Sequence, residues 1–166
     1  MENKNIEAGE SLEVRLGQLL LRKGLTMGTA ESCTGGKIAS LMTSVAGSSA
    51  YFVGGVVSYT NEVKHQVLGV SSEALDRYGA VSQAVVEQMA QGATRVLGCD
   101  CAVATSGIAG PGGGTPAKPV GTVWIAACHG EHVRSACFHF GGDRLGNIRS
   151  SAEAALSMLL ELLEND

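Results

Sequence analysis

The chain of 166 residues is 45% hydrophobic and only 17% charged, which predicts a single domain with a sizeable core and excludes intrinsic disorder of the whole chain. Its formal net charge of -4 has the wrong sign for a protein held by nucleic-acid phosphates, so we expect no nucleic-acid partner. No apolar stretch approaches the roughly 18 residues of a membrane span, so we expect a cytoplasmic protein without a membrane partner.

Hydrophobic spacing predicts alternating helices and strands in the first half of the chain. Residues 1–10 are polar, and we expect them to form a flexible segment ahead of one domain over residues 11–166. The predicted elements are a helix over 11–23, a strand over 25–30, a helix over 38–45, a strand over 51–59 and a short helix that opens at Asn61.

The second half contains a helix, a strand, a long glycine-rich loop, a hairpin and a last helix. The predicted ranges are a helix over 82–97, a buried strand over 101–106, a loop over 107–119, strands over 120–128 and 132–140, and a helix over 147–163. We call residues 107–119 the glycine loop. Gly130-Glu131 suits a two-residue type II′ turn, so we expect the two strands that flank it to pair antiparallel.

This order of elements predicts an α/β fold with three layers, α/β/α. Its mixed sheet combines parallel strands with a C-terminal antiparallel hairpin. In such sheets, ligands collect beyond the carboxyl ends of the parallel strands. Three unusual turns follow strands here, at residues 31–36, 59–64 and 107–119. We therefore expect these three turns to converge on one pocket.

Known phosphate-binding and hydrolase motifs do not match the sequence. A Walker A loop fails because Ile38 follows Gly36-Lys37. The dinucleotide-binding pattern fails because Thr115 stands where a third glycine is needed. Ser32 lacks the flanking glycines of a nucleophile elbow. We expect no cofactor.

Five cysteines, an odd number, indicate reduced thiols rather than a disulfide framework. Several of the possible metal ligands gather on the predicted hairpin, namely Cys128, His129, His132, Cys137 and His139. Pairing across the turn would set Cys128 opposite Val133 and Trp124 opposite Cys137, and alternation would then send these groups to different faces. Because zinc needs four converging ligands, we expect no metal site.

The turn after the first strand is a candidate anion site. A strand that delivers Ser32, Cys33, Thr34, Gly35 and Gly36 to a helix start presents hydroxyl and free backbone N–H groups at the positive end of a helix dipole. Such a turn can cradle a phosphate or stabilise the oxyanion of an acyl-transfer reaction in which Ser32 is the nucleophile. The alternative is that Ser32 or Thr34 is only the N-cap of the helix.

A nucleophilic serine needs a base, and no histidine has an obvious acidic partner. Lys64 follows Tyr59-Thr60-Asn61 in the first turn of a helix, near the carboxyl end of a neighbouring strand, where it can reach Ser32. Burial beside cationic groups can lower a lysine pKa to about 7 to 8, as a base requires. The alternative is an exposed lysine paired with Glu62 or Asp76.

Two further features suit a phosphorylated ligand. The glycine loop offers many N–H groups with few side chains in the way. Arg144 and Arg149 stand near the start of the last helix, where either can clamp a phosphate. A plain surface turn and two solvated arginines are the alternatives.

Four ordered motifs make the sequence similar to a known family. They are Ala30-Glu31-Ser32-Cys33-Thr34-Gly35-Gly36, Tyr59-Thr60-Asn61-Glu62-Val63-Lys64, Gly107-Ile108-Ala109-Gly110-Pro111-Gly112-Gly113 and Lys118-Pro119-Val120-Gly121-Thr122-Val123. Residues 12–163 resemble the CinA C-terminal domain family, which includes nicotinamide mononucleotide amidohydrolases. The resemblance implies deamidation of nicotinamide mononucleotide to nicotinic acid mononucleotide and ammonia, with Ser32 and Lys64 as a catalytic dyad.

The resemblance also implies which residues contact this pyridine mononucleotide. They are Tyr59, Asn61, Ser106, Gly107, Gly110, Gly112, Arg144 and Arg149. Ser106 departs from the family, which more often has threonine there, but a hydroxyl group is kept. Longer members carry a molybdopterin-binding-like domain ahead of this one, and we expect no such domain here, because residues 1–10 are too few to form it.

In the mechanism implied by the resemblance, Lys64 takes the Ser32 proton and Ser32 attacks the amide carbon. The N–H groups of residues 33–36 hold the oxyanion, and the positive pyridinium ring opposes protonation of Lys64. The phosphate falls to the glycine loop or to Arg144 and Arg149. The competing interpretation is a non-catalytic nucleotide-binding or regulatory module with the same pocket.

The apolar run Tyr51-Phe52-Val53 next to Gly54-Gly55 suits a subunit interface. We therefore expect a homodimer or a higher homo-oligomer. The alternative is that this run belongs to the hydrophobic core.

Overall fold

The computed structural model describes residues 9–166 of the chain. The predicted flexible segment at residues 1–10 therefore lies almost entirely outside the described residues. Among the helices of residues 9–166, none combines the length and the apolar character needed to cross a membrane.

Helices and strands alternate along the described chain, and they end in a hairpin and a long helix. In chain order they are α1 Leu12–Lys23, β1 Met27–Glu31, α2 Lys37–Thr43, the 3-10 helix η1 Ser48–Ala50, β2 Phe52–Val57, α3 Asn61–Gln66, α4 Ser72–Tyr78, α5 Gln83–Leu97, β3 Cys101–Gly107, β4 Thr122–His129, β5 His132–His139 and α6 Arg144–Glu164.

The strands form one mixed sheet in the order β2-β1-β3-β4-β5. Strand β1 runs parallel to both of its neighbours, whereas β4 is antiparallel to β3 and to β5. The hairpin register sets Cys128 opposite Val133 and Trp124 opposite Cys137, which confirms the predicted pairing. Gly130 opens the hairpin turn with a φ of 58°, which a glycine adopts without strain.

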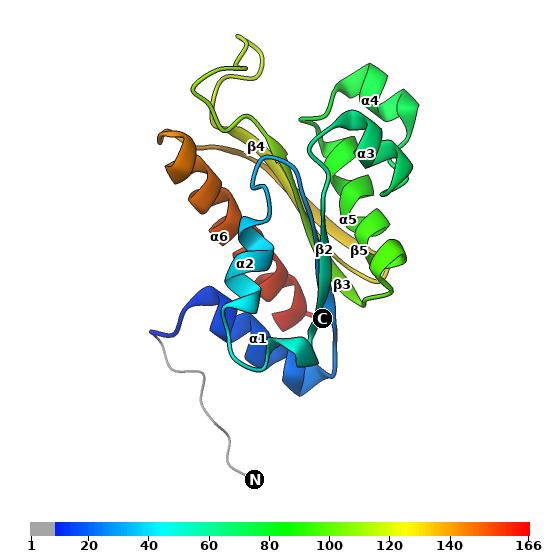
Figure 1. Ribbon diagram of the computed structural model, residues 1–166, viewed down its shortest axis with the longest axis vertical. Coiled ribbons are helices and arrows are strands. Elements are labelled where there is room, and N and C mark those ends of the chain that lie inside the picture. Colours follow the sequence, from blue (N-terminus) through cyan, green and yellow to red (C-terminus); the bar gives the residue numbers. More distant parts are fainter. Residues whose placement is uncertain (1–8) are drawn as a thin grey trace.

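Helices cover both faces of the sheet, which confirms the predicted three-layer α/β/α fold (Figure 1). Helices α1, α2 and α6 lie on one side, and α5 lies on the other side together with the short α3 and α4 (Figure 1). Each face has its own apolar core. Leu16, Ile125 and Leu159 belong to the first core, and Val86 and Met89 belong to the second. Burial of these side chains is the main favourable contribution to folding.

The segment that follows α3 packs closely on α5. Gly92 of α5 faces the backbone of Leu68, just after α3, and a Cβ atom at Gly92 would lie only 2.0 Å from Leu68 O. Arg95 Nη2 also donates to Leu68 O at 2.9 Å. The absence of a side chain at Gly92 therefore allows the segment after α3 to pack directly on α5.

Two helices differ from the sequence-based expectation. Helix α4 was not predicted, although Ser71 caps it by accepting a hydrogen bond from the Ala74 N–H at 3.1 Å. Helix α6 begins three residues earlier than predicted, because Asp143 accepts from the Gly146 N–H at 2.8 Å and so acts as the N-cap. This extension brings Arg144 into the first turn of α6.

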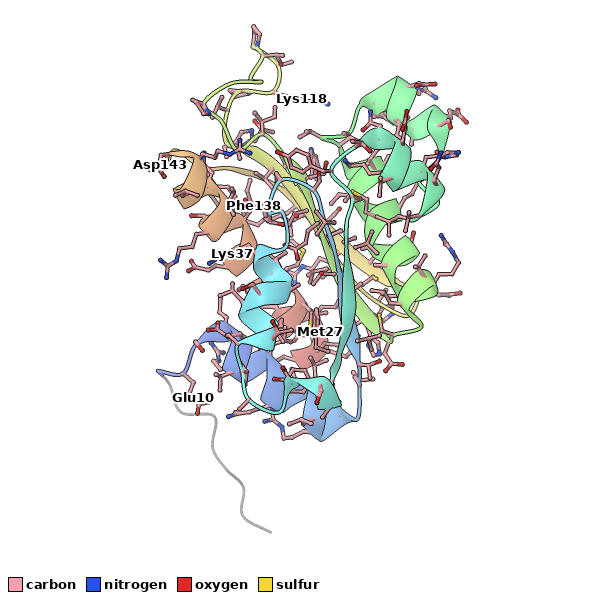
Figure 2. The ribbon with its side chains drawn as sticks, in the orientation of Figure 1. Glu10, Met27, Lys37, Lys118, Phe138 and Asp143 are labelled. Atoms are coloured by element: carbon pink, nitrogen blue, oxygen red, sulfur yellow. The ribbon has the colours of Figure 1, made fainter. Side chains whose placement is uncertain are left out.

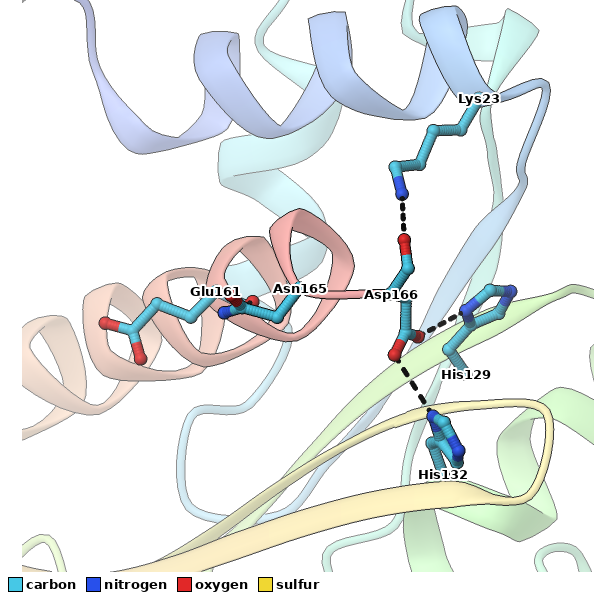
Figure 3. Close-up of polar contacts among 6 residues, drawn as sticks. All are labelled: Lys23, His129, His132, Glu161, Asn165 and Asp166. Carbon is cyan, nitrogen blue, oxygen red and sulfur yellow. Dashed lines mark hydrogen bonds and ion pairs between the residues drawn. The ribbon is translucent and has the colours of Figure 1, made fainter.

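The end of the chain is tied to the hairpin and to α1 (Figure 3). The Asp166 carboxylate accepts from His129 Nδ1 at 2.8 Å and from His132 Nδ1 at 3.1 Å, and these hydrogen bonds lower the pKa of Asp166 below its ordinary value. Lys23 Nζ donates to Asp166 O at 3.1 Å. The two hairpin histidines thus serve to anchor the C-terminus, at the opposite end of the sheet from the glycine loop (Figure 1).

Candidate active site

The register of the three parallel strands brings three serines to one level. Glu31, the last residue of β1, pairs with Val57 on one side and with Thr105 on the other. The next residue along the chain is therefore Ser32, Ser58 or Ser106, of which Ser106 still belongs to β3. The segments that follow β1 and β2 start at this level and the segment that follows β3 starts one residue beyond it, as expected for a ligand site in an open α/β sheet.

A cavity of about 300 Å³ lies at this edge of the sheet. Its lining residues are Ser32, Cys33, Tyr59, Asn61, Lys64, Ala80, Val81, Ser106, Gly107, Ile108, Ala109, Gly110, Gly112, Gly113 and Arg144. All three turns singled out in the sequence contribute to it. Thr34, Gly35, Gly36 and Arg149 are the expected site residues that do not line it.

Lys64 is buried and its ammonium nitrogen faces Ser32. Its side chain is only 1% exposed, and Nζ lies 3.1 Å from Ser32 Oγ and 2.9 Å from the backbone oxygen of Ser58. Thr60 begins the short helix α3 by accepting from the Val63 N–H, which sets the direction of the first turn. An exposed lysine paired with Glu62 or Asp76 is therefore excluded.

Burial lowers the pKa of Lys64 from its ordinary value of 10.5. The cause is desolvation, which disfavours the charged form. Both atoms that contact Nζ are uncharged oxygens, so neither gives the ammonium a counter-ion. A neutral amine can accept the proton of a serine hydroxyl, and this geometry suits Ser32 as a nucleophile with Lys64 as its base.

Cys33 lines the same cavity but does not suit a nucleophile. Burial raises the pKa of the Cys33 thiol to about 11, so the group stays protonated near neutral pH. Only the thiolate form of cysteine is strongly nucleophilic. The hydroxyl of Ser32, which already has a base beside it, is the better candidate.

The helix that follows Ser32 is capped by Glu31 rather than by a hydroxyl. The Glu31 carboxylate accepts from the Ile38 N–H at 2.9 Å and from the Ala39 N–H at 3.0 Å. It also accepts from Thr34 Oγ1 at 2.7 Å and from Thr29 Oγ1 at 3.3 Å. The N-cap position itself is Gly36, which has no side chain. The alternative that Ser32 or Thr34 is the N-cap is therefore wrong.

Glu31 decides which backbone N–H groups of the turn are free. The carboxylate already satisfies the positive end of α2, so that helix end has little attraction left for a phosphate. The Gly35 N–H donates to Ser32 O at 3.0 Å. Within residues 9–166, the N–H groups of Cys33, Thr34 and Gly36 have no acceptor. Of these three residues, Cys33 is the one that lines the cavity.

The glycine loop is fixed over the cavity by polar side chains. Asn147 is buried, and its Nδ2 donates to Ala109 O at 3.0 Å. Ser106 Oγ donates to Ala80 O at 2.8 Å and so joins the base of the loop to the opposite wall. Lys118 Nζ, near the top of the molecule in Figure 2, donates to Tyr78 O at 2.8 Å. The loop is thus part of the site rather than a plain surface turn.

The two arginines occupy different environments. Arg144 donates to Gly110 O at 2.8 Å and to Tyr59 Oη at 3.1 Å, and it lines the cavity. The Arg149 side chain is 75% exposed and pairs with Glu153 at 3.3 Å. Arg144 is therefore the guanidinium group that this cavity offers to an anion.

Comparison with known proteins identifies the family of this chain. The model of the CinA C-terminal domain family matches residues 9–163. The chain belongs to the CinA C-terminal domain family. Among relatives of this family, the nicotinamide-nucleotide amidohydrolase PncC of Pseudomonas putida is 51% identical over 152 residues, which cover 92% of this chain and 95% of the relative.

Two other matches place the chain within the CinA family. The chain spans only 37% of the CinA-like protein of Chloroherpeton thalassium, to which it is 48% identical over 156 residues. The crystal structure of the competence/damage inducible protein CihA from Agrobacterium tumefaciens superposes with a TM-score of 0.89 at 42% identity, covering 91% of this chain and 93% of that one.

Sequence reasoning missed two features of this CinA domain. Glu31 was read only as part of a motif, although a lone acidic residue at the end of an otherwise uncharged strand and shortly before a helix is the signal that marks a cap. Ala80 and Val81 were missed as cavity lining, because they follow the unpredicted helix α4.

The Glu31 cap generates a stability prediction. Glu31→Ala leaves two helix N–H groups and two threonine hydroxyls without their shared acceptor, so we expect it to lower the free energy of unfolding by about 2–4 kcal/mol. Urea denaturation followed by circular dichroism measures this loss. Glu62→Ala, at an exposed position on α3, is the control and should stay within about 0.5 kcal/mol of the wild type. Equal stability of Glu31→Ala and the wild type would contradict the capping role.

Proposed function

We propose that this protein deamidates nicotinamide mononucleotide to nicotinic acid mononucleotide and ammonia. The observation that carries the proposal is the distance of 3.1 Å between Lys64 Nζ and Ser32 Oγ, inside a cavity that the glycine loop and Arg144 also line. The name of the Pseudomonas putida relative, which matches over nearly the whole of both chains, supports the choice of substrate.

The first half of the reaction forms a bond between Ser32 and the substrate. Lys64 takes the proton of Ser32 Oγ, and this oxygen attacks the carboxamide carbon. The carbonyl oxygen becomes an oxyanion, for which the free N–H group of Cys33, at the cavity wall, is the donor. Lys64 then gives its proton to the amide nitrogen, and ammonia leaves as the C–N bond breaks.

The second half restores the enzyme. Water attacks the acyl carbon while Lys64 accepts its proton, and Lys64 then returns this proton to Ser32 Oγ as the bond to Ser32 breaks. The acid product loses its own proton to solvent and leaves as the carboxylate. Throughout the cycle the base must be neutral before each attack. The buried position of Lys64 favours this state, and the positive pyridinium ring of the substrate opposes protonation of Lys64 further.

Arg144 and the glycine loop are the groups that we assign to the phosphate. Helix α2 is already capped by Glu31, so its N-terminus is a poor phosphate site. Arg144 is fixed by Tyr59 and Gly110 at the cavity wall, and the guanidinium group binds phosphate strongly. This division leaves the turn after β1 free for the oxyanion.

Loss of either member of the dyad should abolish turnover without loss of the fold. We expect Ser32→Ala and Lys64→Met to reduce ammonia release from nicotinamide mononucleotide by at least about 10³-fold. Circular dichroism checks that each variant is folded, and the assays contain EDTA. Cys33→Ala is the control for the neighbouring thiol and should retain most of the activity. Substrate binding without ammonia release by the wild type would instead favour a non-catalytic nucleotide-binding module.

The phosphate assignment predicts a change in KM. Arg144→Ala should raise KM about tenfold or more and leave kcat within a few fold, because phosphate binding is equal in the ground state and the transition state. Arg134→Ala removes an exposed arginine that pairs with Glu161, and it should leave both constants unchanged. A larger rise in KM for Arg149→Ala than for Arg144→Ala would place the phosphate outside this cavity.

We also propose that two copies of the chain pair through β2. This strand is an edge of the sheet, and Val53 and Val57 are about half exposed. Val53-Gly54-Gly55-Val56 reads the same in both directions, which suits antiparallel pairing about a two-fold axis. Tyr51, by contrast, is buried in the core.

The pairing predicts a dimer that one charge can disrupt. Val53→Lys should convert the dimer into a monomer, measured by light scattering after gel filtration. Val96→Lys is the matched control, because Val96 is 46% exposed and Val53 is 48% exposed. A monomeric wild type, or equal dissociation by both variants, would contradict the pairing.

A further inference from the structure

The hydroxyl group of Ser58 is buried beside the dyad and has no hydrogen-bond partner in the described part of the chain. Ser58 follows β2 directly and is fully buried. Its N–H donates to Glu31 O at 2.8 Å and its carbonyl oxygen accepts from Lys64 Nζ at 2.9 Å. Within residues 9–166, Ser58 Oγ makes no hydrogen bond. A buried hydroxyl without a partner is unfavourable, and such a group calls for an explanation.

The hydrogen atoms of Lys64 supply that explanation. A neutral amine has two N–H groups and one lone pair. In the neutral form, one N–H donates to Ser58 O at 2.9 Å, and the lone pair can accept the proton of Ser32, whose Oγ lies 3.1 Å from Nζ. The second N–H has no acceptor within the described residues. Once Lys64 has taken the proton, two of its three N–H groups have Ser58 O and the Ser32 oxygen as acceptors. The remaining N–H still has none, and an acceptor for it matters more now because the group is charged.

We propose that Ser58 Oγ accepts the third N–H of the Lys64 ammonium and so acts as a positioning residue in the proton transfer. Oγ and the carbonyl oxygen that already touches Nζ belong to the same residue, so rotation about the Cα–Cβ bond moves the hydroxyl near Nζ without a backbone change. The proton passes from Ser32 Oγ to Lys64 Nζ and later to the leaving nitrogen, so no other reactant is needed. This inference rests on the proposed amidohydrolase function.

The other charged or titratable groups around Lys64 do not take this place. They are Glu31 and Cys33 at the end of β1, Tyr59 and Arg144 at the cavity wall, and Glu62 and His65 on α3. In the described part of the chain, none of them forms a hydrogen bond with Nζ. Burial lowers the pKa of Lys64, and acceptors for its N–H groups raise this pKa. Ser58 Oγ is the acceptor that we add to Ser32 Oγ and Ser58 O.

The test is the pH profile of ammonia release by Ser58→Ala. An acceptor for the ammonium raises the pKa of Lys64, so its removal should move the acid limb of kcat/KM to lower pH by about one unit. The charged intermediate also loses one hydrogen bond, so kcat on the plateau should fall about tenfold. In the wild type, the acid limb should lie below pH 10.5, the ordinary lysine value.

Two controls separate this role from a purely structural one. Tyr51→Phe removes another buried hydroxyl that has no partner, away from the cavity, and should change neither the acid limb nor kcat. Ser58→Thr keeps the acceptor and should behave like the wild type. If Ser58→Ala does not fold, Ser58→Cys keeps the shape with a weak acceptor and should reproduce the shift.

Each outcome has a separate meaning. An acid limb that stays in place or moves to higher pH in Ser58→Ala would overturn the role of Ser58 while leaving the dyad intact. An active wild type with equal profiles for Ser58→Ala and Tyr51→Phe would overturn it too. Absence of ammonia release by the wild type would overturn the proposed function, and the role of Ser58 with it.

Discussion

The burial of the Lys64 amine against two uncharged oxygens is the constraint on which the whole site depends. An ammonium group at this place loses its hydration, and among residues 9–166 its hydrogen-bond partners are Ser32 Oγ and Ser58 O. Burial therefore favours the neutral amine, which is the form that can act as a base. A serine next to such an amine needs neither a histidine nor an acidic partner to become a nucleophile.

Strand pairing in the sheet fixes the relative positions of the segments that carry Ser32 and Lys64. Because β1 pairs in parallel with β2 and β3, the residues that follow Glu31, Val57 and Thr105 lie at one level. Gly92 lets α5 approach the segment after α3, so the chain just beyond the helix that carries Lys64 packs directly on α5. Backbone pairing between the strands and the small size of Gly92 therefore bring together segments that are far apart in the chain. Side-chain interactions at the site are not needed for this placement.

Glu31 and Arg144 place opposite charges at different positions around the cavity, and of these two residues Arg144 lines it. Glu31 satisfies the N-terminus of α2 internally, which removes a common phosphate site and stabilises the turn that carries Ser32. Arg144 stands at another wall and is oriented by Tyr59 and Gly110. The separation suits a substrate that has a reactive amide at one end and an anionic group at the other.

Local periodicity and the Gly130 turn were sufficient to predict the α/β/α class, the order of the main elements and the register of the hairpin. Sequence patterns also indicated that the turns at Ser32 and Lys64 and the glycine loop meet, since parallel strands share a carboxyl edge. The burial of Lys64 and the exposure of Arg149, in contrast, became known only from the structure. These two properties depend on what packs over each side chain, and such contacts come from residues that are distant in the sequence.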